Sequence, residues 1–128
     1  MTPKKVIVCG GRDYANAALV NEVLSKIKPE IIIEGGANGA DALARQWAKE
    51  HGVECRTYQA DWKRHGKAAG PIRNQRMIDE EQPDLCVAFP GGSGTENMIG
   101  KCAKAGVKLF IVGDAGEGRI VRAWETPL

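Results

Sequence analysis

The chain has 128 residues, and its 18 basic and 16 acidic side chains leave a net charge of +2. This balance argues against a nucleic-acid partner, which favours a stronger and more clustered basic excess. Lys4 and Lys5 precede only a four-residue apolar run, and no apolar run approaches the length of a membrane span. We therefore expect no signal peptide, no membrane partner and a cytoplasmic location. Residues 1–128 are expected to form one domain, with 113–128 as its C-terminal tail.

The spacing of the cysteines bears on metals and disulfides. The four cysteines are Cys9, Cys55, Cys86 and Cys102, and none forms a Cys-x-x-Cys pair. They lie in strand-like runs or on an apolar helix face, which is typical of buried, reduced thiols. Neither histidine lies near a cysteine ligand pattern, so the sequence predicts no metal site, and we expect no cofactor.

Short apolar runs alternate along the chain with residues at helical spacing. Strands are predicted at 6–9, 31–33, 53–58, 85–89 and 107–112. Helices are predicted at 16–28, around 43–48, from about 71 to 81, and from the turn at 90–95 to Gly106. Residues 61–70 are predicted to be a polar loop. The tail either adds a short edge strand near 120–121 or packs and frays without regular structure.

This alternation predicts an α/β fold, a three-layer sandwich in which helices cover both faces of a parallel sheet of about five strands. We expect right-handed crossovers and the strand order 3-2-1-4-5, which reverses between the first and fourth strands. Ligands of such sheets bind beyond the carboxyl ends of the strands, at this switch point.

Glycine-rich turns follow the first, second and fourth predicted strands, at 10–13, 35–39 and 90–95. In the third turn, Pro-Gly-Gly-Ser-Gly-Thr, Thr95 is predicted as the N-cap of a helix whose free N–H groups and positive dipole end suit a phosphate. The turn is neither a Walker loop nor the dinucleotide fingerprint, because no Gly-Lys-Ser/Thr follows and Asn97 replaces the third glycine. The three turns are either separate structural turns or, as we expect from their convergence at one sheet edge, one site for a phosphate-bearing ligand.

Five segments carry a resemblance to a known family. They are Gly10-Gly11-Arg12-Asp13, Glu34-Gly35-Gly36-Ala37-x-Gly39-Ala40-Asp41, Ala60-Asp61-Trp62, Gly66-Lys67-x-Ala69-Gly70-Pro71-x-Arg73-Asn74 and Phe89-Pro90-Gly91-Gly92-x-Gly94-Thr95. Together they resemble a small stand-alone SLOG domain of the YspA-like branch of bacteria and phages, up to about residue 112. The resemblance implies a Rossmann-like fold that binds nucleotides or nucleotide-derived ligands. Relatives include the "lonely guy" phosphoribohydrolases, the Smf/DprA DNA-uptake proteins and sensor domains linked to NAD-derived signals, so family alone does not fix function.

The hydrolases of this group supply the sharpest test. They carry Arg-Lys-x-x-Met before the fourth strand and Pro-Gly-Gly-x-Gly-Thr-x-Glu-Glu after it. This chain keeps Arg73 of the first motif but has Asn74 for the lysine, and it has Asn97 and Met98 at the two glutamate positions. Glu96 lies one position early, and one step along a helix turns a side chain by about 100°. The missing acid weakens the hydrolase interpretation.

Several residues of the expected site have two interpretations. Arg12 and Arg73 suit phosphate, because guanidinium makes bidentate contacts to phosphate oxygens, or they are ordinary surface arginines. Asp41 contacts a ribose or an amide, or it stabilises the first turn of its own helix. Asp13 holds a ribose hydroxyl or shapes its turn. Trp62 stacks on a base or nicotinamide ring, or it covers an edge of the core.

Three further side chains are weaker candidates. Asn74 either binds an amide edge of the ligand or caps a nearby backbone group. His65 is either a general acid or a solvated loop residue. Glu96 is either catalytic or stabilises its own helix. The residues expected to bind the ligand are Gly10, Gly11, Arg12, Asp13, Gly35, Gly36, Gly39, Asp41, Trp62, Arg73, Asn74, Pro90, Gly91, Gly92, Ser93, Gly94 and Thr95.

Three functions are compatible with these patterns. The first is binding of an adenosine-, ADP-ribose- or NAD-related ligand by a sensor or sequestering domain. The second is an N-glycosidase acting on a nucleotide, with Glu96, Asp41 or Asp13 as the acid and Arg73 on the phosphate. The third is a DNA-linked accessory protein like Smf/DprA, against which the near-neutral charge counts. Apolar helix faces, and the dimers formed by the related hydrolases, favour a homodimer.

Overall fold

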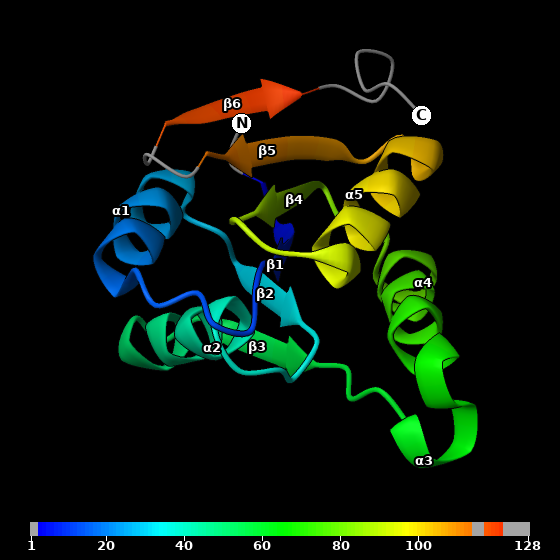
Figure 1. Cartoon of the computed structure of the whole chain (residues 1–128). Coiled ribbons are helices and arrows are strands. Elements are labelled where there is room, and N and C mark those ends of the chain that lie inside the picture. The colour runs from blue at the N-terminus through cyan, green and yellow to red at the C-terminus, as the bar shows by residue number, and fades with distance from the viewer. Residues whose placement is uncertain (1–2, 114–116, 122–128) are drawn as a thin grey trace.

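The computed structural model describes residues 3–113 and 117–121 of the chain. Helices and strands alternate through most of its length (Figure 1). In chain order they are β1 (Lys5–Cys9), α1 (Ala17–Ile27), β2 (Ile31–Glu34), α2 (Ala40–Glu50), β3 (Glu54–Thr57), α3 (Trp62–His65), the 3-10 helix η1 (Gly66–Ala68), α4 (Ala69–Glu81), β4 (Leu85–Ala88), α5 (Ser93–Ala105), β5 (Lys108–Val112) and β6 (Gly118–Val121). Among the described residues, no helix is both long and apolar enough to cross a bilayer.

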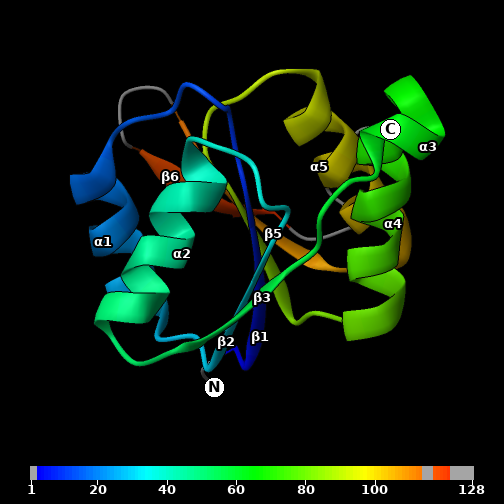
Figure 2. The ribbon, with the colours of Figure 1, turned by 90° about the horizontal axis from the view of Figure 1, so that it is seen from below.

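The strands form one six-stranded sheet in the order β3-β2-β1-β4-β5-β6. The first five are parallel, which confirms the predicted order 3-2-1-4-5 and the Rossmann-like α/β fold. β6 pairs with β5 in the antiparallel sense, so part of the tail adds an edge strand, one of the two expected outcomes. Helices α1 and α2 cover one face of the sheet, and α4 and α5 cover the other (Figure 2).

Two apolar clusters, one on each face, hold these layers together. Val6, Val8 and Ile32 point toward α1 and α2, while Ile7 and Ile33 point toward α4 and α5. Both sets are buried because alternate side chains of a central parallel strand face opposite layers. The continuous Val/Ile runs of β1 and β2 therefore reflect burial on two faces. Because both faces are covered by helices, polar functional groups can gather only at the ends of these strands, and here they gather at the carboxyl ends.

Helix boundaries differ from the sequence prediction at two places. Residues 61–70, predicted as a loop, contain α3, η1 and the start of α4, and Asp61 caps α3 by accepting a hydrogen bond from the Arg64 N–H (3.1 Å). Helix α5 begins at Ser93 with Gly92 as its N-cap, so the prediction that Thr95 is the N-cap was wrong. Thr95 lies inside the first turn, where its hydroxyl occupies the space that a Cβ on Gly91 would need.

The four cysteines are free thiols. Cys9, Cys86 and Cys102 are buried as expected, whereas Cys55 on the edge strand β3 is only half-buried. The Sγ atoms of Cys9 and Cys86 lie 3.8 Å apart on neighbouring strands. Hydrogen bonding by neighbouring thiols and burial raise the pKa of Cys86 well above its usual value, which keeps that thiol protonated.

Candidate functional site

The three glycine turns meet at the carboxyl edge of the sheet and are hydrogen-bonded to one another. The Gly11 N–H donates to the Pro90 carbonyl (2.9 Å), which joins the first turn to the third. The Ala40 N–H donates to the Gly11 carbonyl (3.1 Å), which joins the start of α2 to the first turn. A Cβ on Gly39 would overlap the backbone of Gly11 and Arg12. These glycines are therefore needed for close packing of backbone on backbone.

A cavity of about 720 Å³ opens beside these turns, between the sheet edge and helices α4 and α5. That volume is within the range of small-molecule sites. A smaller cavity of about 210 Å³ adjoins it and shares Arg12, Gly35, Ala37, Trp62 and Arg73 with it. The larger cavity is lined by Val8, Cys9, Gly10, Gly11, Arg12, Gly35, Ala37, Asp41, Trp62, Lys67, Gly70, Pro71, Arg73, Asn74, Met77, Gly92, Ser93, Gly94, Thr95 and Asn97.

Arg73 reaches this cavity from α4 as a half-buried cation. Its Nη1 donates to the carbonyls of Gly35 and Tyr58, the latter at 3.4 Å, and its Nε donates to Asn74 Oδ1 at 3.0 Å. Burial lowers the pKa of Arg73, with a smaller contribution in the same direction from the positive charge of Arg12, while the negative charges of Asp41 and Glu34 oppose this fall. Among the described residues no carboxylate oxygen lies within 4.0 Å of Arg12 or Arg73. The cavity therefore receives two guanidinium groups without a direct anionic partner.

Trp62 stands at the rim of the cavity on α3. Its side chain is 48% exposed, and the guanidinium carbon of Arg12 lies 5.4 Å from the ring centroid, a cation–π distance. The ring also lies over Gly70, where an added Cβ would come within 3.4 Å of it. An exposed ring held in this way by Arg12 leaves an aromatic surface beside the two cations.

Asp41 is the buried acid of the cavity wall. Its Oδ2 accepts hydrogen bonds from the Gly35 N–H (3.1 Å) and the Ala37 N–H (3.3 Å), so one carboxylate oxygen shapes the second glycine turn. Burial raises the pKa of Asp41 to about 6, and the negative charge of Glu34 adds to the rise. The carboxyl group is therefore partly protonated near pH 6.

Glu34 also stabilises this turn; it is part of a family motif in the sequence but was not predicted as a site residue. It is fully buried, and its Oε1 accepts from Arg45 Nη1 and from the Gly36 N–H, both at 2.7 Å. Thr57 Oγ1 donates to the other oxygen. An acid at the end of a β-branched strand, immediately before paired glycines, is the signal that could have identified it.

The start of α5 forms the opposite wall. No side chain caps this helix, and Ser93, Gly94 and Thr95 of its first turn line the cavity, where unpaired N–H groups favour an anion. Glu96 is exposed and does not line the cavity, and Met98 is buried in the core. Asn97 occupies the cavity position on this helix.

The structure thus brings most of the expected site residues to one cavity. Gly36 lines only the smaller cavity, and Asp13, Gly39, Pro90, Gly91 and Glu96 line neither. His65 also lies outside both. The polar lining residues that sequence reasoning missed are Asn38, Gln59, Lys67 and Asn97. Lys67 lies within the family segment at 66–74, and Asn97 lies just after the glycine turn at 90–95. Whether their side chains face the cavity depends on how α4 and α5 pack, which the sequence does not show.

The fold and the arrangement of its turns define a Rossmann-like α/β protein with a ligand-sized cavity at the carboxyl edge of its sheet. More particularly, the chain belongs to the YspA, cpYpsA-related SLOG family, whose sequence model matches residues 4–65. It is 33% identical over 123 residues to the Gene 61 protein of Mycobacterium phage D29, covering 87% of this chain and 98% of the phage protein. Membership of this family suggests a nucleotide-related ligand or glycosidase-like activity.

A solved structure supports the fold independently. The crystal structure of the structural-genomics target TM1055 superimposes with a TM-score of 0.62 at 19% identity, covering 83% of this chain and 72% of that one. At that identity the likeness establishes the fold alone.

Proposed function

We propose that the chain binds a phosphate-bearing, nucleotide-derived ligand in the larger cavity, as a sensor or sequestering domain for an adenosine-, ADP-ribose- or NAD-related molecule. The observation that carries this proposal is Arg73, a half-buried guanidinium that faces the cavity beside Arg12 with no carboxylate within 4.0 Å. Arg12 is exposed to solvent, and the charges of Asp41 and Glu34 partly offset that of Arg73, but neither arginine has a direct anionic partner; a phosphate in the cavity would supply one.

In this proposal the first turn of α5 and Arg73 hold a phosphate from two sides. Helix N–H groups and a guanidinium are the donors that phosphate oxygens accept best. Trp62 offers its ring to a base near the rim, with Arg12 between the ring and the phosphate. The smaller cavity, which shares Arg12 and Arg73 with the larger one, leaves room for a second polar part of the ligand.

A second candidate function is an N-glycosidase, because Asp41 lines the cavity and its raised pKa suits a group that exchanges protons near pH 6. One oxygen of Asp41 is committed to the turn, and Glu96 is exposed outside the cavity. Asn97 and Met98 cannot stabilise a developing positive charge on a sugar electrostatically. We therefore propose binding first and hydrolysis second.

The experiment that tests binding is a thermal-shift screen with AMP, ADP-ribose, NAD and cyclic relatives, followed by calorimetry. Ligand at 100 times its dissociation constant should add about 2.7 kcal/mol to the free energy of unfolding. Arg73→Ala should weaken binding by about 1.5–3 kcal/mol, the range for a charge-assisted contact. Arg76→Ala is the matched control, because Arg76 lies one turn further along α4, is exposed and pairs with Glu80. A folded chain that responds to no member of the panel contradicts the proposal.

A separate assay distinguishes binding from turnover. We expect little or no release of free base when the chain is incubated with AMP or related monophosphates, measured by chromatography. Robust release that disappears in Asp41→Asn or Glu96→Gln would replace the binding proposal with the enzyme.

We also propose that the whole chain acts as a single domain and forms a homodimer. The apolar faces of α1, α2, α4 and α5 pack against the sheet, so the interface would use the large apolar side chains left exposed among the described residues, Trp62 and Ile72. Light scattering that finds only the 13.8 kDa species at all tested concentrations contradicts the dimer.

A further inference from the structure

Two asparagines link Arg73 to the far wall of the cavity. Asn74, on α4, is 5% exposed. Its Oδ1 accepts from Arg73 Nε at 3.0 Å, and its Nδ2 donates to Asn97 Oδ1 at 3.1 Å and to the Gly94 carbonyl at 3.4 Å. Asn97, on α5, is half-buried and lines the larger cavity.

The direction of both amides follows from groups that have no choice of role. A guanidinium only donates, and a backbone carbonyl only accepts. Arg73 therefore fixes the oxygen of Asn74 on its own side, and Gly94 independently fixes the Asn74 NH₂ on the other. Since that NH₂ also faces Asn97, the oxygen of Asn97 must point toward Asn74.

The consequence appears at the cavity surface. The oxygen of Asn97 is held on the side of Asn74, and no hydrogen bond among the described residues uses Nδ2 of Asn97, so its NH₂ group can donate to a ligand. We propose that Asn97 contacts the ligand as a hydrogen-bond donor and selects a ligand atom that accepts and carries no hydrogen: a phosphate oxygen, a carbonyl oxygen or a ring nitrogen. Asn74 is then a positioning residue: Arg73 fixes the orientation of its amide, and this amide in turn fixes the orientation of Asn97.

This inference rests on the proposed function, and it refines that function. A single aspartate-like acceptor at position 97 would suit a hydroxyl or an amino group of a ligand, whereas a fixed donor rejects an amino group. Lys67, Arg73 and the N–H groups at the start of α5 also line the cavity as donors. The wall formed by η1, α4 and α5 thus presents mainly donors, together with the hydroxyls of Ser93 and Thr95, which donate or accept, and Asp41 faces it from α2.

The test measures binding of AMP and of ribose 5-phosphate by calorimetry at pH 8. Asn97→Ala removes the donor without adding charge, and Asn97→Asp keeps the shape and the hydrogen bond from Asn74 but offers only an acceptor. Both variants should weaken binding about tenfold or more, as expected for a hydrogen bond to a charged group. Gln46→Glu, an exposed residue on α2 that lines neither cavity, is the control for added negative charge and should bind like the wild type.

Comparing the two ligands, AMP and ribose 5-phosphate, identifies which part of the ligand accepts the hydrogen bond from Asn97. Loss with ribose 5-phosphate as well as AMP places the acceptor on the phosphate or sugar, and loss with AMP alone places it on the base. A loss of more than threefold in both Asn97 variants with AMP supports the proposal, and a smaller loss in either overturns it. If the wild type binds neither probe nor any member of the nucleotide panel, the proposed function falls together with this inference. If the wild type binds and Arg73→Ala weakens binding while the Asn97 variants do not, only this inference falls.

Asn74 is tested through a double-mutant cycle. Asn74→Ala should weaken AMP binding in the wild-type background and add less than threefold in the Asn97→Ala background, because its effect passes through Asn97. An equal loss in both backgrounds would show that Asn74 acts without Asn97 and would overturn the relay. If Asn74→Ala fails to fold, the Asn97 variants, which change a half-buried residue, still decide the proposal.

Discussion

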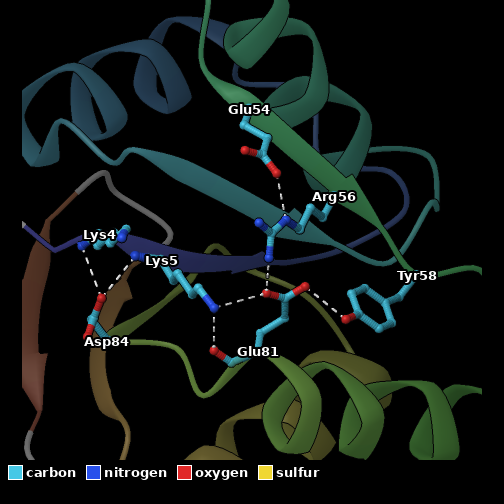
Figure 3. Close-up of polar contacts among 7 residues, drawn as sticks. All are labelled: Lys4, Lys5, Glu54, Arg56, Tyr58, Glu81 and Asp84. Carbon is cyan, nitrogen blue, oxygen red and sulfur yellow. Dashed lines mark hydrogen bonds and ion pairs between the residues drawn. The ribbon is translucent and has the colours of Figure 1, made fainter.

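Two polar clusters include residues of α4, and they differ in whether their charged groups are paired. In the Glu81 cluster (Lys5, Arg56, Tyr58 and Glu81), Glu81 accepts from Arg56 Nη1 at 2.6 Å and from the Tyr58 hydroxyl at 2.8 Å, and Lys5 Nζ lies 3.5 Å from it (Figure 3). In the Arg73 cluster (Arg12, Asp41, Arg73 and Asn74), Arg73 donates to two carbonyls and an amide, and Arg12 lies over the Trp62 ring. Among the described residues, neither arginine has a carboxylate within 4.0 Å. We call the Glu81 cluster closed, because its acid is paired with cations within the cluster. We call the Arg73 cluster open, because its arginines line a cavity without a direct carboxylate partner.

The pKa values of the buried acids in the two clusters are shifted in opposite directions. Burial alone would raise the pKa of Glu81, but hydrogen bonds from Tyr58 and Arg56 and the charges of Arg56 and Lys5 outweigh it and leave that pKa below its usual value. For Asp41 burial prevails, and its pKa rises to about 6. Direct cationic partners make Glu81 a structural anion, whereas the cations near Asp41 remain available to a ligand.

The largest expected effect comes from breaking the backbone frame of the open cluster. Gly39→Ala should lower the free energy of unfolding by about 3–5 kcal/mol, because its φ is +69° and its Cβ would overlap the backbone of Gly11 and Arg12. Urea unfolding measures this change. Gly52→Ala is the matched control, because Gly52 has φ +65° with nothing within 4 Å of an added Cβ. Equal losses at the two glycines would show that strain, and not the close approach of the turns, sets the cost.

Titration of Asp41 should produce the next largest effect. Its pKa is about 6 in the folded chain and near 3.8 in the unfolded one, so the folded state binds more protons between these values. The free energy of unfolding should therefore fall as pH rises from 4 to 7, by about 2.4 kcal/mol from this group. Unfolding of wild type and Asp41→Asn across this range isolates the contribution, because the asparagine does not titrate. A difference between the two chains that is constant with pH contradicts the raised pKa.

Opening the closed cluster should cost somewhat less. Glu81→Ala removes the acceptor shared by three partners and should lower the free energy of unfolding by about 2 kcal/mol, since Arg56 and Lys5 can turn partly to water. Glu80→Ala, one residue earlier in an exposed pair with Arg76, should change it less. Arg73→Met should also cost less than Glu81→Ala, because it leaves no buried acid without its direct partner. If Arg73→Met lowers the free energy of unfolding more than Glu81→Ala does, Arg73 serves the stability of the fold and is not held in reserve for a ligand.

The smallest effect compares two glycines of α5. An added Cβ on Gly94 or Gly100 meets nothing within 4 Å, so either alanine substitution should raise the free energy of unfolding by about 1 kcal/mol through helix propensity. Gly94 lines the cavity and Gly100 does not. Only Gly94→Ala should therefore weaken nucleotide binding, as calorimetry would measure. Equal affinities in the two variants would place the ligand away from the start of α5.

Local patterns predicted much of this protein. The strands and helices could be predicted because β-branched runs and helical spacing are properties of neighbouring residues, and the strand order followed from their alternation and the rule of right-handed crossovers. The convergence of the glycine turns next to Arg12 and Asp41 followed from that order, because the carboxyl ends of parallel strands share an edge, whereas Arg73 lies on α4 and was expected from the family resemblance. The α3 helix and the position of Thr95 were missed, because each depends on where a helix starts after a glycine or an aspartate, which shifts easily by a few residues.

The sequence by itself determined which segments become strands, helices and glycine turns, since periodicity and backbone freedom act over a few residues. Only the tertiary structure decided which polar groups are paired and which are left open. The hydrogen bonds that decide this join residues far apart in the chain: Lys5 to Glu81 across 76 positions, Arg73 to Gly35 across 38, and Asn74 to Asn97 across 23. Whether Glu81 is neutralised and whether Asn97 presents its NH₂ group depend on how α4 packs against β1, β2 and α5, because the polarity of an amide and the pKa of an acid are set by the groups that surround them.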